Sequence, residues 1–194
     1  METSIIISGF GGQGALFAGQ LLAYAGMDAG RFVSWIPSYG PEMRGGTAHC
    51  TIIIGDDEIG APIVARPDVA IVFNLPSYDK YEPLVKPGGL LVVNSSLVAN
   101  ASRRSDITVV AVPANAIAEE WGTPKMTNMA AIGAMLAARP VLPLPIVEAA
   151  LVAHLPASKQ HLIEANLQVL RHGYAVGHGY AVGHGFAVGL PAHV

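Results

Sequence analysis

A glycine-rich segment near the start of the chain has the spacing of an anion-binding turn. Gly9, Gly11 and Gly14 match the pattern G-x-G-x-x-G, after a β-branched run and before residues with helical spacing. Glycine permits positive φ and lets the backbone approach another group closely, and the first turn of a helix offers free N–H groups and a partial positive charge. Together with Gly12 and Gln13, these glycines predict a tight turn that can cradle a phosphate.

Two common nucleotide motifs fit this turn poorly. A dinucleotide site places an acidic residue about 20 residues further on, at the end of the second strand, but residues 33–38 contain no carboxylate. A Walker A loop needs Lys-Ser or Lys-Thr after its last glycine, and neither follows Gly14. Three interpretations stay open: close packing of strand against helix, a contact with a phosphate or a partner's backbone, and a free-standing Rossmann-like NAD(P)-binding oxidoreductase.

A second segment, residues 37–46, contains two prolines and three glycines, which do not suit a regular element. Arg44 can present a planar fork to a carboxylate or phosphate, and Glu42 can orient Arg44 or a partner's cation. A solvated turn has no need of Tyr39 or Met43, so we predict a loop that contacts a partner or a substrate channel. Its residues are Ser38, Tyr39, Gly40, Pro41, Glu42, Met43, Arg44, Gly45 and Gly46.

Cysteine and histidine chemistry finds little support in the sequence. Cys50 is the only cysteine, so the chain cannot supply the four thiolates that an iron–sulfur cluster usually takes. In a strand the side chains of His49 and Cys50 point to opposite faces, and we interpret Cys50 as a buried apolar residue. We assign no catalytic residue and no metal ligand. Of the seven histidines, we interpret His49, His154 and His161 as structural. The other four lie in or beside the C-terminal repeats, and three of them offer at most a weak metal site: His172, His178 and His184.

The composition narrows the classes of protein to consider. The 194 residues are 52% hydrophobic and 13% charged, about half the usual charged share, which indicates a large area buried in the core or against partner subunits. A net charge of −3 with no basic cluster argues against a nucleic-acid partner. No apolar run reaches the roughly 20 residues of a membrane helix, and the N-terminus lacks the features of an export signal. We therefore expect a cytoplasmic protein with no membrane contact.

Strand-like and helix-like segments alternate along the chain, which favours an α/β fold with a mostly parallel, doubly wound sheet. We expect a three-layer, Rossmann-like single domain over residues 1–177, with 47–54 as a hairpin strand. The expected strands are 4–8, 32–36, 47–54, 69–73, 90–93 and 107–112, and the expected helices follow Gly14 and cover 114–121, 128–138, 145–154 and 158–172.

The C-terminus is a repeat of six residues. His-Gly-Tyr-Ala-Val-Gly begins at His172 and recurs from His178, and from His184 with Phe in place of Tyr. Three copies are too few for a stable solenoid, and half of each copy is glycine or alanine. We interpret the repeats as a flexible or loosely docked segment, with residues 178–194 forming a tail outside the domain.

The glycine turn together with the loop at 38–46 resembles the gamma subunit of the 2-oxoacid:ferredoxin oxidoreductases, which act on pyruvate, 2-oxoglutarate or branched-chain 2-oxoacids. Further matches are Arg-Pro-Asp at 66–68, Pro-Gly-Gly at 87–89 and Thr-Asn-Met at 127–129, so the resemblance covers roughly residues 3–176. Residues after Gly177 depart from the family pattern.

This resemblance implies a function within a larger complex. The family oxidatively decarboxylates a 2-oxoacid to an acyl-CoA and reduces ferredoxin, with thiamine diphosphate, Mg²⁺ and iron–sulfur clusters held by alpha, beta and, in some members, delta subunits rather than by the gamma chain. The chain is then expected to be inactive alone, and self-association of the isolated chain stays open. A non-catalytic interaction domain that retains only the fold is the other alternative, beside the NAD(P)-binding oxidoreductase. The residues expected near coenzyme A are Gly9, Gly11, Gly12, Gln13, Gly14 and Asn128, with the loop at 38–46 facing a partner or the substrate channel.

Overall fold

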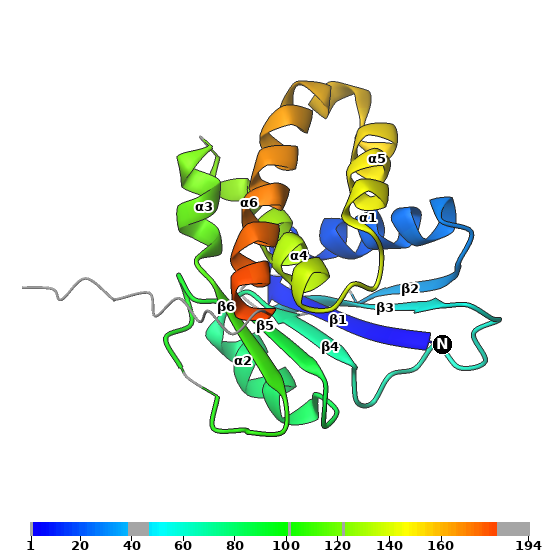
Figure 1. Cartoon of the computed structure of the whole chain (residues 1–194), viewed down its shortest axis with the longest axis vertical. Helices are drawn as coiled ribbons and strands as arrows, with labels where there is room; N and C mark the ends of the chain where they lie inside the picture. Colours follow the sequence, from blue (N-terminus) through cyan, green and yellow to red (C-terminus); the bar gives the residue numbers. More distant parts are fainter. Residues whose placement is uncertain (1, 39–46, 101, 122, 182–194) are drawn as a thin grey trace, which may run out of the picture.

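One mixed sheet forms the centre of the molecule. The computed structural model describes residues 2–38, 47–100, 102–121 and 123–181. Within them the strands follow the order β2–β3–β1–β4–β5–β6, with β3 antiparallel to both neighbours and β1, β4, β5 and β6 parallel (Figure 1). The strands are β1 (Glu2–Phe10), β2 (Phe32–Ser38), β3 (Thr47–Gly55), β4 (Val69–Val72), β5 (Leu90–Asn94) and β6 (Thr108–Val112). The predicted α/β class and the hairpin strand are confirmed.

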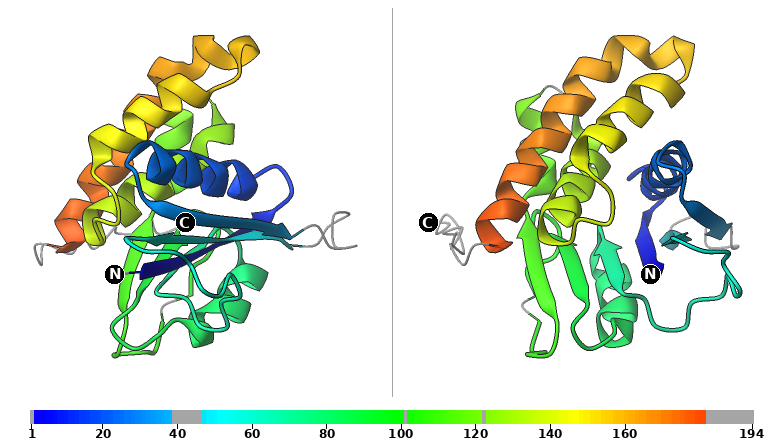
Figure 2. Two further views of the ribbon diagram at one scale, coloured as in Figure 1. Left: turned by 90° about the vertical axis from the view of Figure 1, so that its right-hand side faces the viewer. Right: turned by 45° about the vertical axis from the view of Figure 1, so that its right-hand side comes forward.

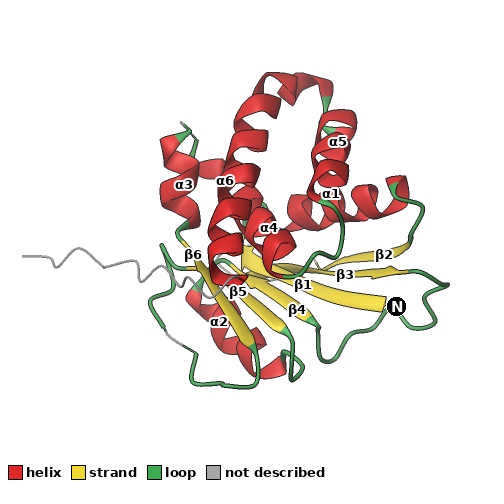
Figure 3. Cartoon of the chain, viewed as in Figure 1, coloured by secondary structure: helices red, strands yellow, loops and turns green. Residues whose placement is uncertain are grey.

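Helices cover both faces of this sheet, but unequally (Figures 2 and 3). One face carries a thick layer of α1 (Ala15–Asp28), α3 (Ala114–Glu120), α4 (Thr127–Ala138), α5 (Leu144–His154) and α6 (Ile163–Ala181). The other face carries α2 (Leu75–Tyr81). Short 3₁₀ turns lie at Glu82–Leu84, Pro124–Met126 and Ala157–Leu162.

The central strands are apolar on both sides because both faces are covered. Ile5 and Ile7 of β1 pack into the core under the thick layer, and Ile6 between them packs into the smaller core under α2. Sequence-based bounds for β1 were too short, since the pairing with β3 extends from Glu2 to Phe10. Among the described residues, no helix combines the length and hydropathy needed to cross a bilayer.

Helix α2 has no counterpart in our sequence-based prediction. Asn74 caps it, with its side-chain oxygen accepting from the backbone N–H of Ser77 at 2.9 Å, and a proline lies in the first turn. Tyr78 and Tyr81 of this helix are buried against the sheet. The capping signal was present in the sequence, but seven residues are too few for helical periodicity to show.

Helix α6 corrects our interpretation of the repeats. It continues through the first copy and ends at Ala181, beyond the predicted end at His172. A Cβ built on Gly173 would lie 2.0 Å from the carbonyl oxygen of Ala130 in α4, and one on Gly177 would lie 2.4 Å from that of Ala134. The first copy is therefore packed helix rather than flexible tail. The predicted domain boundary after Gly177 falls inside this helix, and residues 182–194 lie outside the described part.

Candidate functional site

The sheet topology places the glycine turn and Asn74 side by side, at the edge formed by the carboxyl ends of β1 and β4. From β1 the chain enters α1 on one face, and from the neighbouring β4 it enters α2 on the opposite face. A crevice at the carboxyl ends of two such strands is the usual ligand position in open α/β sheets. The glycine turn follows β1 at this point, and Asn74 follows β4.

Two glycines of the turn are explained by packing. A Cβ on Gly9 would lie 2.7 Å from the Oε1 atom of Gln13 and 3.0 Å from the Cβ atom of Phe73. Gly14 caps α1 with φ of 75°, and a Cβ there would lie 2.6 Å from the Nδ2 atom of Asn128. For Gly9 and Gly14, close packing of strand against helix is thus sufficient reason for the residue type.

Packing does not explain the two glycines between them. Gly11 and Gly12 are exposed, and a Cβ on either would meet no described atom within 4 Å. Gly12 needs its left-handed φ of 95°, whereas Gly11 has no positive φ. The bare backbone of these two residues, beside the N-terminus of α1, therefore leaves room for another molecule to approach closely.

Gln13 shapes the turn from within. Its Oε1 atom accepts from the backbone N–H of Phe10 at 2.6 Å and from the Nδ2 atom of Asn74 at 3.3 Å. Its own backbone N–H donates to the carbonyl oxygen of Phe10 at 3.1 Å. Gln13 was expected near a phosphate, but it uses its own backbone N–H inside the turn. Its side chain ties the end of β1 to the end of β4.

Asn128 braces the turn from the other side. It lies buried at the start of α4, where its Nδ2 atom donates to the carbonyl oxygen of Gly14 at 3.2 Å and its Oδ1 atom accepts from the N–H of Met129 at 3.0 Å. The structure therefore brings Asn128 to the glycine turn, as the sequence analysis expected, in contact with the turn's backbone.

Further amides line this edge that the sequence analysis missed. At the end of β5, the Nδ2 atom of Asn94 donates to the Oδ1 atom of Asn115 at 2.9 Å and to the carbonyl oxygen of Phe73 at 3.4 Å. Ser96 links the two segments, since its Oγ atom accepts from the N–H of Asn115 at 3.3 Å. Amides that follow successive strands, at positions 74 and 94, were the available signal.

The predicted partner loop begins and ends on the same edge. Ser38 closes β2 opposite His49, and Thr47 opens β3 opposite Phe10, the last residue before the glycine turn. Residues 39–46, which include Tyr39, Glu42 and Arg44, lie outside the described residues. The two ends of the loop are nevertheless fixed beside the turn by strand pairing.

Cys50 and His49 behave as the sequence indicated. Cys50 lies in the core under α1, where burial raises the pKa of its thiol from 9.0 to about 12, and His49 points to the other face, with its ring 5.9 Å from that of Tyr81. A neutral, buried thiol does not fit the ligand set of an iron–sulfur cluster. Within the described part of the chain, no group of three or more His, Cys, Asp or Glu side chains is placed to hold a metal.

Comparison with known proteins identifies the family of the chain. Residues 4–176 match the family described as Pyruvate ferredoxin/flavodoxin oxidoreductase. The chain belongs to this family. The 2-oxoglutarate synthase subunit KorC of Methanocaldococcus jannaschii is 32% identical over 179 residues, which cover 91% of this chain and 94% of that protein. The ketoisovalerate oxidoreductase subunit VorA of Methanothermobacter marburgensis is 42% identical over 136 residues, which cover 70% of this chain but only 28% of VorA. The chain thus corresponds to about a quarter of the length of this longer relative.

Solved structures share the fold of this oxidoreductase family member. A keto/oxoacid ferredoxin oxidoreductase gamma subunit from Geobacter sulfurreducens aligns with a TM-score of 0.78 and 29% identity, covering 90% of this chain and 98% of that one. The 2-oxoglutarate:ferredoxin oxidoreductase from Magnetococcus marinus aligns with a TM-score of 0.82 at 21% identity, covering 91% of this chain and 31% of that one. The three-layer fold is therefore common to a separate gamma subunit and to part of a longer polypeptide.

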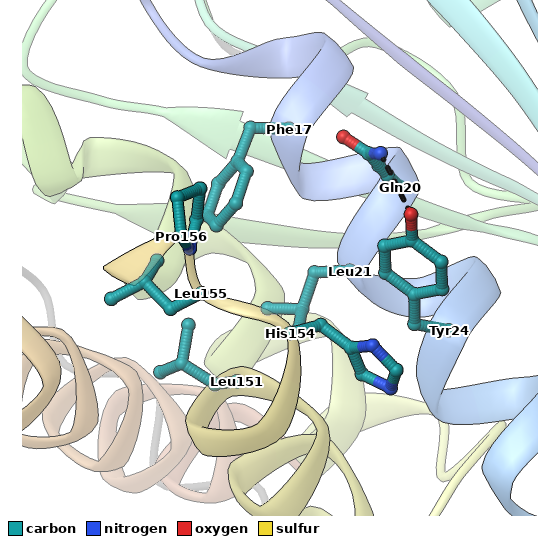
Figure 4. Close-up of a pocket in the computed structure, with 8 residues that line it drawn as sticks. All are labelled: Phe17, Gln20, Leu21, Tyr24, Leu151, His154, Leu155 and Pro156. Atoms are coloured by element: carbon teal, nitrogen blue, oxygen red, sulfur yellow. Dashed lines mark hydrogen bonds between the residues drawn. The ribbon is translucent and has the colours of Figure 1, made fainter. Parts of the chain in front are cut away.

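The family domain also has a small hollow away from this edge (Figure 4). It has a volume of about 220 Å³ and lies between α1 and α5, with an apolar floor and a polar rim. On the rim, the rings of Tyr24 and His154 stack with centroids 4.3 Å apart, and the Nε2 atom of His154 lies 2.9 Å from the Oδ2 atom of Asp28. These contacts join α5 to α1, which gives the hollow a structural explanation.

Proposed function

We propose that this chain is the gamma component of a 2-oxoacid:ferredoxin oxidoreductase. In this proposal, the side of the sheet where the parallel strands have their carboxyl ends faces a reaction centre held by partner chains. Family membership and likeness to a gamma subunit along almost its whole length support this assignment. The alpha, beta and, where present, delta chains would hold thiamine diphosphate, Mg²⁺ and the iron–sulfur clusters, and ferredoxin would accept the electrons. The single buried Cys50 agrees with that division of labour.

In this proposal the glycine turn contacts a phosphate of coenzyme A. The observation that carries it is the bare backbone of Gly11 and Gly12, which needs no side chain and meets no described neighbour, next to the positive end of α1. Gln13 and Asn128 hold the turn in shape from behind. The Magnetococcus enzyme was solved with coenzyme A bound, so a coenzyme A site within such an assembly has a precedent.

A carboxylate placed at Gly11 tests this assignment in the assembled enzyme. The chain would be co-expressed with its partner chains, and coenzyme A-dependent reduction of ferredoxin would be followed with a panel of 2-oxoacids. Because Gly11 has open space and no positive φ, Gly11→Glu should fold normally. We expect it to raise the KM for coenzyme A at least tenfold, about 1.4 kcal/mol, while Gly11→Gln has a smaller effect.

Gly60 provides the matched control for the added charge. It is exposed, a Cβ there meets no described atom within 4 Å, and it lies in the segment between β3 and β4. Gly60→Glu adds the same charge and should leave the KM unchanged. An unchanged KM in Gly11→Glu would show that the turn does not contact the coenzyme.

The loop at 38–46 is proposed as the contact with the partner chains. Its ends are paired beside the glycine turn, so a partner that binds it would close over the same edge. Arg44→Ala should weaken assembly of the complex, measured as the fraction of this chain that co-purifies with its partners, with the exposed Arg103, substituted as Arg103→Ala, as the control arginine. Normal assembly and turnover with Arg44→Ala would contradict this role.

The topology gives no support to a free-standing NAD(P) module. In the dinucleotide fold the second parallel strand adjoins the first and carries the acidic residue that binds the ribose. Here the antiparallel β3 lies between β1 and β2, and β2 has no carboxylate. A calorimetric titration of the isolated chain with NAD(P) should therefore show no binding.

A further inference from the structure

Strand β2 is the outermost strand on one side of the sheet in the part of the chain that the structure describes. It is hydrogen-bonded to β3 on its inner side, and it lies at the rim of the sheet (Figure 2). Strand β1 is buried over most of its length, whereas no residue of β2 is fully buried. Residues 32–38 also contain no charged side chain. Sheet edges usually carry charges that prevent pairing with another strand, and this edge has none.

The proline in β2 indicates which backbone groups face outward. Pro37 has no N–H, and a proline in a sheet occupies an edge position where that group would have faced solvent. Alternate residues of an antiparallel strand point their N–H and C=O groups to the same side. The outward groups of β2 are therefore those of Val33 and Trp35, and regular pairing has to stop at Pro37.

Two exposed apolar side chains flank the centre of this edge. Phe32 is 45% exposed and Ile36 is 42% exposed, and because they are four residues apart they project from the same face. A hollow of about 520 Å³ adjoins the first half of the strand, lined by Phe32, Val33, Ser34, Glu58, Ile59 and Pro62. The surface beside the edge is thus accessible, and its lining combines apolar side chains with Ser34 and Glu58.

We infer that β2 is a self-association edge, at which a second copy of this chain adds its own β2 in antiparallel orientation around a two-fold axis at Ser34. In this register Phe32 lies opposite Ile36 of the second copy, so the two exposed apolar side chains cover each other twice. Val33 lies opposite Trp35 of the second copy, so the outward backbone N–H and C=O groups of each residue can pair with those of the other. Self-complementarity of this kind is what a two-fold interface requires.

The absence of charged side chains in β2 also favours a second copy of this chain as the partner strand. The paired segments carry no charge, so the two strands meet without like-charge repulsion across the axis. At the end of the seam, Arg31 lies opposite Pro37 of the second copy and already forms an ion pair with Asp56 of its own chain. The result would be one continuous sheet across the dimer, which goes beyond the proposed enzymatic role and does not depend on it.

A charge-swap pair tests the register in the full-length chain. Phe32→Lys with Ile36→Glu places lysine opposite glutamate across the axis, whereas Phe32→Lys with Ile36→Lys places lysine opposite lysine. Sedimentation equilibrium should show a dimer for the wild type and for the Lys/Glu variant. The Lys/Lys variant should dissociate at least about tenfold more readily than the Lys/Glu variant.

A cysteine on the axis gives a second measurement that does not require those variants to fold. Opposed residues of a non-hydrogen-bonded antiparallel pair have Cα atoms about 4.5 Å apart, which lies within the range of a disulfide. Ser34→Cys should therefore form a cross-linked dimer under mild oxidation. Ser38→Cys is the control, because in this register its two copies lie roughly 25 Å apart, and Cys50 is buried.

Three outcomes would overturn the inference. The first is a wild-type chain that is monomeric over the accessible concentration range. The second is equal dissociation of the Lys/Glu and Lys/Lys variants, which would mean that residues 32 and 36 do not face each other. The third is cross-linking of Ser38→Cys as fast as that of Ser34→Cys, which would place the contact elsewhere.

Discussion

Substitution of Gly173 by alanine tests whether the first repeat copy belongs to the core. In an isolated helix this change is favourable, by about 1 kcal/mol. In the folded protein the added methyl group would lie 2.0 Å from the carbonyl oxygen of Ala130. On the opposite helix, a Cβ on Gly133 would likewise lie 2.0 Å from the carbonyl oxygen of Leu170. Helices α4 and α6 therefore touch backbone to backbone.

The size of the effect follows from that distance. Ordinary contact with a Cβ atom begins near 3.4 Å, so the helices would have to separate by about 1.4 Å, enough to forfeit half or more of the dispersion energy across the contact. Overpacking costs typically 1–3 kcal/mol, and the rigid backbone on both sides favours the upper end. After the gain in helix propensity, we expect a net loss of about 2 kcal/mol, or a Tm lower by roughly 4–8 °C.

Thermal unfolding followed by circular dichroism measures this effect. Ala175→Gly, on the exposed side of α6, should cost about 1 kcal/mol through propensity alone, and Gly60→Ala should be neutral. If helix propensity alone acted, Gly173→Ala would raise the stability and Ala175→Gly would lower it. With the packing of α6 on α4 included, both substitutions lower the stability. If Gly173→Ala melts at or above the wild-type temperature, α6 is not docked on α4 as described, and the repeats are a tail after all.

Three further predictions concern single side chains. Cys50 should be inert to thiol reagents at pH 8 in the native state and reactive in denaturant, because burial raises its thiol pKa to about 12; rapid native labelling would contradict its placement. Burial alone would raise the pKa of Asp68, but hydrogen bonds from Ser4 and the nearby Lys86 lower it below 3.8. Asp68 therefore stabilises the fold above that pH and loses this effect as pH falls through the lowered value, so urea unfolding of Asp68→Asn should differ from the wild type at pH 7 and converge with it in acid. Gln13→Ala should cost about 1 kcal/mol in the same assay, since the N–H of Phe10 loses its acceptor; no change would mean that Gln13 does not hold the turn.

The sheet was predictable from sequence because its strands carry their own signal. β-Branched runs bounded by glycine, proline and asparagine located all of the strands that the structure describes, within a few residues at their ends. Helix α2 was missed because it is a short helix of seven residues between buried strands. The end of α6 was missed because glycine-rich sequence indicates flexibility, and the partner that makes glycine necessary, Ala130, lies 43 positions away from Gly173 in the chain.

The candidate site was only partly predictable for the same reason. Motif spacing found the glycine turn, and the resemblance added Asn128. The contacts that shape the turn join Gln13 to Asn74 and Asn128 to Gly14, across 61 and 114 positions. No local pattern encodes such pairs, so the sequence could name the turn but could not separate the glycines that pack from those that lie open.

That separation decides what the turn can do. If Gly9, Gly11, Gly12 and Gly14 all served packing, the turn would have a structural role only. Any substitution would then lower the stability of the fold and the activity of the enzyme together. Gly9 and Gly14 face atoms within 3 Å, whereas Gly11 and Gly12 face none that the structure describes. Substitutions at Gly9 or Gly14 should therefore lower stability, and those at Gly11 should leave stability intact while altering the affinity for an anion. A Gly11→Glu chain that unfolds as readily as Gly14→Ala would show that the turn has a structural role only and that its open backbone carries no ligand.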